Sequence, residues 1–168
     1  MRIFPLLFLL VSAVPVHAAD NPVVHRLLDH WNKSKDYMLR IAAQMPEAGY
    51  SSRPNAEEMT FGEQLLHIAN DTEFLTQGLT TKKHPTFDAK HITKDSAMKA
   101  LAASFDDGAQ AIESLTDSDL NNKMVDAGGG KMTALEVVIF AMDHIEHHRG
   151  QCIVYLRVKG IKPVDYVF

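Results

Sequence analysis

The pattern of apolar and polar residues has a helical period along most of the chain. Apolar residues recur every three or four positions in four long segments, which is typical of amphipathic α-helices that bury one face. Strict alternation, the mark of a half-buried strand, is sparse. The segments lie at residues 22–45, 61–79, 94–115 and 134–159. The sequence therefore predicts an all-α protein, and four such helices favour a four-helix bundle.

Residues with known capping preferences mark the ends of these segments. Asn21 followed by Pro22 is a favoured helix start, because asparagine caps free N–H groups and proline at the first position has none to satisfy. We expect the last helix to end at Gly160, since glycine readily adopts the left-handed conformation that follows a helix. A threonine precedes each of the other helices, and two of these have glutamate three residues later, as in a capping box. They are Thr60, Thr93 and Thr133.

The link at residues 116–132 is rich in polar residues and glycine, and we predict it to be irregular with at most a brief extended piece. Its GGGK run, which ends at Lys131, resembles part of a phosphate-binding loop. Met132 stands where that motif needs serine or threonine, and Val125 stands where it needs the first glycine. The sequence therefore excludes a phosphate-binding loop here.

The composition and the N-terminal residues indicate the class of protein and the compartment in which it acts. The 168 residues carry a formal net charge of −4 and no basic cluster, so we expect no nucleic-acid partner. Residues 1–18 combine a positive start at Arg2, an apolar run and a small-residue cleavage site, as in a secretory signal peptide. We expect cleavage after Ala18 and an exported protein, periplasmic or secreted. Its single domain is expected to span residues 19–168, without a membrane span.

A histidine pair on the last helix is the strongest chemical signal in the sequence. His144 and His148 are four residues apart and therefore lie one turn apart on the same helix face. Glu146 is one place too late for the motif of zinc proteases. The spacing alone leaves two interpretations open, a metal site or a partly exposed polar flank. His147 points to the solvated side, and the helical wheel alone predicts that His67 is a half-exposed helix residue.

We expect the remaining histidines and the single cysteine to have no part in the site. We expect His25 and His30 to lie at the surface or border of the first helix, and His84 and His91 to be solvated in the link between the second and third helices. Cys152 is the only cysteine, so no intrachain disulfide can form, and it is expected to pack as a small hydrophobe.

Two other polar residues of the last helix lie near the histidine pair or the core. Arg149 projects near the apolar side, where its guanidinium should meet a carboxylate or backbone carbonyls as a structural clamp. Gln151 lies near the histidine side of the helix, where it is placed to orient a ligand or a bound water.

Taken together, these motifs resemble the DinB family, whose members include relatives of bacillithiol transferases. The likeness lies in the letters TFGEQLLHI at positions 60–68, in HxxxHRGQ at positions 144–151 and in the following YLRxxG, which ends at Gly160. The resemblance implies an up-down-down-up four-helix bundle over essentially the whole mature chain. It also implies a divalent metal held by one histidine of the second helix and two of the last.

Carried onto this sequence, the implied metal ligands are His67, His144 and His148. Three imidazoles leave a coordination position open, as in catalytic sites. Zinc is the first expectation, and nickel and iron are also compatible with imidazole ligands. The catalytic residues are not identified, although Glu63 and Asp71 are the nearest candidate general bases on the second helix.

Three functions remain open at this point. The first is a metal-dependent transferase or hydrolase that acts on a small substrate of unknown identity. The second is a non-catalytic periplasmic protein that binds or buffers metal. The third is a bundle kept for self-association, for example as a homodimer, with a site that binds no metal.

Overall fold

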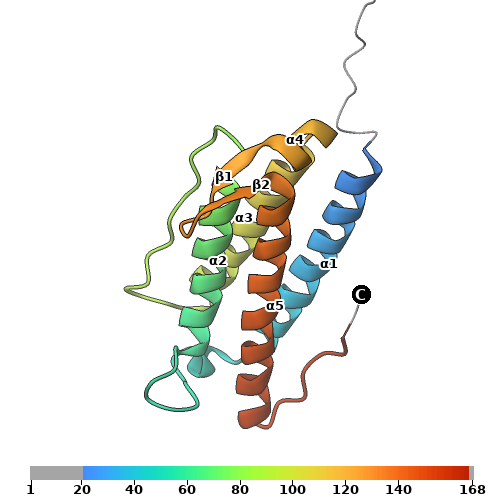
Figure 1. Cartoon of the computed structure of the whole chain (residues 1–168). Coiled ribbons are helices and arrows are strands. Elements are labelled where there is room, and N and C mark those ends of the chain that lie inside the picture. Colours follow the sequence, from blue (N-terminus) through green and yellow to red (C-terminus); the bar gives the residue numbers. More distant parts are fainter. Residues whose placement is uncertain (1–20, 167–168) are drawn as a thin grey trace, which may run out of the picture.

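Four long helices run side by side in the computed structural model, which describes residues 21–166 (Figure 1). The predicted signal peptide at residues 1–18 lies outside the described residues. No helix within the described part of the chain is long and apolar enough to cross a membrane. The long helices are α1 (Pro22–Gln44), α2 (Phe61–Gln77), α3 (Lys94–Glu113) and α5 (Ala134–Val158). The predicted all-α bundle is confirmed.

The order of the helices around the bundle is α1, α3, α2, α5, and α5 returns to α1. Figure 1 shows α2 and α3 running in the same direction, whereas α1 and α5 run in the opposite one. This is the up-down-down-up arrangement that the resemblance implied. Because α2 and α3 are parallel, residues 78–93 must return along the outside of α2 before α3 begins.

The capping signals act as the sequence predicts. The Asn21 side chain accepts hydrogen bonds from the N–H groups of Val23 and Val24. Thr60, Thr93 and Thr133 each form a capping box at the start of their helix. At the far end of α5, Gly160 has φ +74°, and the N–H of Ile161 bonds the Leu156 carbonyl at 2.9 Å. This is the paired hydrogen bonding of a Schellman motif, which stops the helix.

The link at residues 116–132 has more structure than predicted. It contains a short helix, α4 (Asp117–Asn122), followed by an antiparallel hairpin of β1 (Met124–Asp126) and β2 (Lys131–Thr133). The expected brief extended piece is present, but the prediction of an irregular link was wrong. Strands of three residues are too short to give a clear alternating pattern. The glycines instead form the hairpin turn, where Gly128 has φ +81°.

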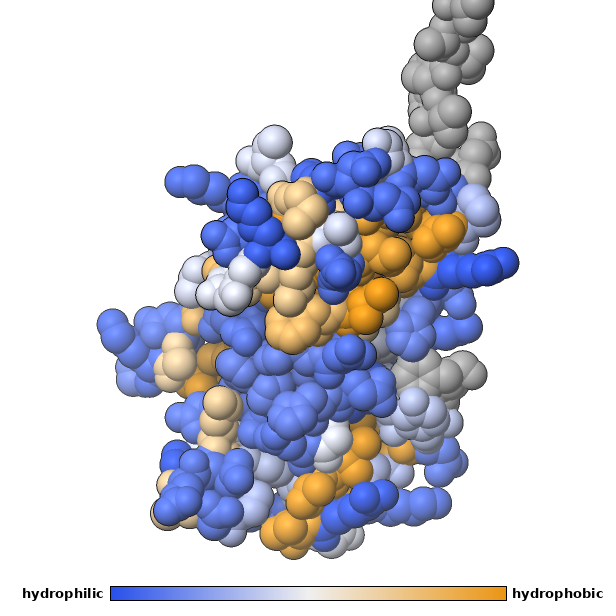
Figure 2. All heavy atoms as spheres, in the orientation of Figure 1, coloured by the Kyte–Doolittle hydropathy of each residue, from blue (hydrophilic) through white to orange (hydrophobic). Residues whose placement is uncertain are grey.

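The core is built from the apolar faces of all four long helices. Its largest member, Trp31 of α1, is fully buried, stacks edge-on against Phe105 of α3 with 5.5 Å between ring centroids, and donates a hydrogen bond to the Phe105 carbonyl at 2.8 Å. The surface is mostly hydrophilic on the face that carries α5, although two apolar areas interrupt it (Figure 2). The exposed apolar residues of α5 are Ile139, Phe140, Val154 and Val158.

Arg149 and Cys152 of α5 both lie inside the bundle. The Arg149 guanidinium is 2.5 Å from the Glu146 carboxylate, donates to the Ser34 hydroxyl at 3.2 Å and lies over the Tyr37 ring. The predicted structural clamp is therefore confirmed. Cys152 has no exposed surface, and burial raises the pKa of its thiol to about 12. The thiol thus stays protonated and packs as a core residue, as expected.

Candidate metal centre

Three histidines from two neighbouring helices meet at the seam between α2 and α5. His67 comes from α2, and His144 and His148 come from successive turns of α5. One ring nitrogen from each lies within 4.8 Å of the other two. The Nε2 atoms of His67 and His144 are 3.3 Å apart. The structure therefore brings together the three histidines that the resemblance implied, and this cluster could hold a metal ion.

The surroundings of the cluster favour neutral imidazoles. Burial lowers the pKa of His148 to about 4, with a further contribution from the neighbouring histidines. Burial also lowers the pKa of His144, although the carboxylate of Asp71 acts in the opposite direction. A neutral imidazole has one nitrogen with a free lone pair, which is the form that binds metals. The donor set therefore fits a divalent cation.

Gln64 sets the orientation of the His148 ring. Its side-chain oxygen is 2.6 Å from Nδ1 of His148, so this nitrogen carries the proton and Nε2 is left unprotonated. The amide of Gln64 then donates to Gln151 at 2.6 Å, and Gln151 in turn contacts His147 at 2.8 Å. A hydrogen bond to the second ring nitrogen is the usual support of a metal-binding histidine. Gln151 thus contacts Gln64 and His147 rather than the three histidines directly.

Gln64 was not predicted as a site residue, although the sequence carries a signal for it. Gln64 lies three residues before His67 and therefore on nearly the same face of α2. A buried polar residue at that position needs a partner, and Gln64 is only 1% exposed. What the sequence could not supply is the partner itself, because His148 lies 84 positions away on another helix.

Of the two candidate bases on α2, only Asp71 lies at the cluster. Its Oδ2 atom is 3.2 Å from Nε2 of His144 and 3.5 Å from Nε2 of His67. Glu63 is occupied elsewhere, because its carboxylate caps the start of α2 at Thr60 and lies 3.6 Å from Arg53. Asp71 is therefore the carboxylate that can take part in chemistry at this site.

The other histidines lie outside the cluster. His147 is exposed, as predicted, as are His25, His30 and His91. The prediction that His84 is solvated was wrong, because its side chain is only 2% exposed and its Nδ1 atom lies 2.6 Å from the Glu73 carboxylate. The polar composition of the α2–α3 connection gave no sign that this segment folds back onto α2 and buries the ring.

Comparisons with known proteins agree with this picture. Residues 30–152 match the family model of the DinB superfamily. The chain is 26% identical over 144 residues to the uncharacterized protein YjoA of Bacillus subtilis strain 168, covering 84% of this chain and 91% of YjoA.

Solved structures of DinB-like proteins show the same fold. The crystal structure of YjoA superimposes with a TM-score of 0.68 at 19% identity, covering 84% of this chain and 96% of YjoA. A DinB-like protein from Bacillus cereus ATCC 10987 gives 0.71 at 19% identity, with coverages of 85% and 97%. A putative DinB family member from Exiguobacterium sibiricum 255-15 gives 0.64 at 16% identity, with coverages of 88% and 97%.

Proposed function

This chain belongs to the DinB superfamily, and we propose that it is an exported metal-dependent transferase or hydrolase acting on a small substrate. The observation that carries the proposal is the convergence of His67, His144 and His148 at the α2–α5 seam. Burial lowers the pKa of His144 and His148 and thereby favours the neutral form that metals bind. Three histidine ligands leave room for a water or a substrate group.

The residues around the cluster have separable roles in this proposal. A bound divalent ion would act as a Lewis acid and would lower the pKa of a water or substrate group coordinated to it. Gln64 holds His148 with Nε2 unprotonated. Asp71, within 3.5 Å of two of the ring nitrogens, is placed to accept a proton from a nucleophile at the cluster. Zinc is our first choice of metal because imidazole-rich open sites suit it, while nickel and iron remain compatible.

Elemental analysis of the protein purified from its native host tests the metal. We expect about one divalent ion per chain, removed by a strong chelator. A protein that contains no metal and binds none when metal is offered would contradict the proposal. Metal identity also narrows the reaction class before a substrate is chosen.

Turnover then separates an enzyme from a metal-binding protein. We expect activity on a panel of small hydrolysable and group-transfer substrates to disappear with chelation and to return with the metal. The Asp71→Asn variant should retain metal and lose most of the activity, because it keeps the size of the side chain but removes its basicity. Tight metal binding without turnover on any substrate would instead support a non-catalytic periplasmic metal-binding protein.

A further inference from the structure

A chain of hydrogen bonds leads from the loop before α2 to the ring of His148. The Tyr155 hydroxyl donates to the backbone carbonyl of Met59 at 2.5 Å, and the Gln64 amide lies 3.5 Å from the same hydroxyl. Gln64 also contacts Gln151 and Nδ1 of His148, each at 2.6 Å. Gln64, His148 and Tyr155 are all buried, so their polar atoms depend on one another for hydrogen bonds.

The direction of these hydrogen bonds is fixed at the Met59 end. A backbone carbonyl can only accept, so the proton of the Tyr155 hydroxyl is directed at Met59. Burial raises the pKa of Tyr155 above its ordinary value, and the hydroxyl therefore keeps this proton at neutral pH. The Tyr155 oxygen is left with lone pairs only. It can accept a hydrogen bond from Gln64 but cannot donate one to it.

Gln64 passes this direction on to the histidine. Its side-chain amide has one donor end and one acceptor end. Because the nitrogen faces Tyr155, the oxygen faces His148. The oxygen accepts the proton of Nδ1, so the free lone pair of the neutral His148 ring lies on Nε2. Since Gln64 occupies Nδ1, Nε2 is also the nitrogen that is available to a metal.

Gln151 cannot fix the direction by itself. Its side chain is another amide, and its second partner is His147, whose ring nitrogen can either donate or accept. A half-turn of both amides would keep the contact between Gln64 and Gln151 and would exchange donors and acceptors along the chain. The reversed chain would place the Gln64 oxygen against the Tyr155 oxygen, whose proton is already used. Tyr155 therefore decides between the two directions.

We propose that Tyr155 is a positioning residue of the metal centre, which holds the neutral His148 ring in the tautomer with a free Nε2 through the amide of Gln64. The importance of this tautomer for metal binding rests on the proposed function, whereas the tautomer itself is a property of the metal-free protein. When a binding-competent state is only partly populated, the apparent affinity falls by that fraction. Tyr155 thus acts on metal affinity through Gln64.

Nitrogen NMR of the histidine side chains tests this role in metal-free, isotope-labelled protein at about pH 8, where imidazoles are neutral. The ¹⁵N chemical shifts of a neutral ring report which nitrogen carries the proton. We expect His148 to be protonated mainly at Nδ1, and we expect Tyr155→Phe to move about half or more of the population to Nε2. Metal titration of this variant should show a loss of affinity of about two- to fivefold, by the same factor as the loss of the Nδ1-protonated form.

Tyr50→Phe is the matched control. Tyr50 and Tyr155 are both buried, pack against Phe61 and donate to a backbone carbonyl, which is that of Ala42 in the case of Tyr50. Of the two, Tyr155 is the one that contacts Gln64. Tyr50→Phe should therefore leave the His148 tautomer and the metal affinity unchanged. Equal effects of the two substitutions on the tautomer, or no effect of Tyr155→Phe, would overturn the inference.

Gln64→Glu tests whether the effect passes through the amide. A carboxylate can only accept, so in this variant the bond from Nδ1 no longer depends on Tyr155. Adding Tyr155→Phe to Gln64→Glu should cost no further metal affinity, and a further loss of about two- to fivefold would show that the tyrosine acts by another route. If the protein binds no metal but the His148 tautomer responds as expected, the proposed function fails and the action of Tyr155 on the ring stands.

Discussion

His147 and His148 are adjacent in sequence but lie in different environments. Successive residues on a helix point about 100° apart, so His148 faces α2 and is 7% exposed while His147 faces solvent. Their rings pack edge to face with 4.9 Å between centroids, and a hydrogen-bond path through Gln151 and Gln64 also joins them. At the scale of single residues, therefore, only His148 points into the cluster. Replacing each of the two histidines in turn tests whether the cluster binds the metal.

Alanine replacements of these two neighbours should have opposite outcomes. We expect His148→Ala to lower metal affinity sharply, by at least about a hundredfold, because it removes a proposed ligand. His147→Ala should retain metal with an affinity within a few-fold of the original, since His147 is not one of the three proposed ligands and packs edge-on against the His148 ring. Bound metal is measured in both variants side by side. Equal losses, or no loss in either, would show that the cluster is not the metal site.

The lowered pKa of His148 also predicts how the metal-free protein responds to acid. The folded state binds a proton at this ring only near pH 4, whereas the unfolded chain binds it near pH 6.5. The unfolded state therefore gains protons first, and the free energy of unfolding should fall as pH drops from about 6.5 to about 4. The expected loss from this ring is ~2–3 kcal/mol, at 1.36 kcal/mol per unit of pKa.

Urea unfolding of the metal-free protein at several pH values checks this expectation. The His148→Gln variant is the control, because glutamine does not titrate in this range. We expect the variant to lose less stability than the original protein between pH 6.5 and pH 4. Parallel pH profiles for the two proteins would mean that His148 is not held neutral by its surroundings.

At the scale of helices, local signals in the sequence were enough to predict the elements but not their contacts. Asn21, the three threonine caps and Gly160 each act within a few residues, so the sequence alone locates the starts of the four long helices and the end of the last one. His67 is half-exposed, as its position on the helical wheel predicted. That it faces His144 and His148 depends on α2 packing against α5, which only the family resemblance indicated. The burial of His84 depends on the same kind of long-range contact.

The seam between α1 and α3 depends on a close approach at Gly108. A β-carbon added at this position would lie 2.3 Å from the ring of Trp31, which is fully buried and cannot move aside. We therefore expect Gly108→Ala to lower the free energy of unfolding by ~1–3 kcal/mol, as for other overpacked cores. Chemical denaturation of the purified variant measures this change.

Gly150→Ala provides the matched control on α5. A β-carbon at Gly150 would meet nothing within 4 Å, so the gain in helix propensity should raise stability by ~0.5–1 kcal/mol. The two substitutions are chemically identical and both lie within long helices. Destabilisation of similar size in both variants would contradict the assignment of Gly108 as the packing contact.

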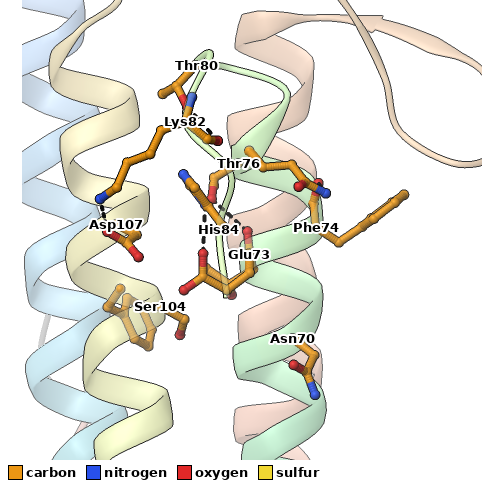
Figure 3. Close-up of polar contacts among 12 residues, drawn as sticks. Asn70, Glu73, Phe74, Thr76, Thr80, Lys82, His84, Ser104 and Asp107 are labelled. Atoms are coloured by element: carbon orange, nitrogen blue, oxygen red, sulfur yellow. Dashed lines mark hydrogen bonds and ion pairs between the residues drawn. The ribbon is translucent and has the colours of Figure 1, made fainter. Parts of the chain in front are cut away.

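At the scale of the whole molecule, the parallel arrangement of α2 and α3 explains why residues 78–93 run along α2. The connection between them has to return along α2, and it covers the face of α2 that leads to the histidine cluster. An antiparallel pair could be joined by a short loop at one end of the bundle. The cluster at the α2–α5 seam and the buried contact of His84 with Glu73 (Figure 3) thus both follow from the up-down-down-up order.

We predict that the molecule acts outside the cytoplasm. The positive residue Arg2, the apolar run after it and the small-residue site before Ala19 support export with removal of residues 1–18. Intact-mass measurement of the protein recovered from the envelope or medium of its native host should therefore give a chain that starts at Ala19. The control is Ala18→Arg, which places a large charged residue at the cleavage site and should leave the leader attached. A soluble cytoplasmic product that retains Met1 would contradict export.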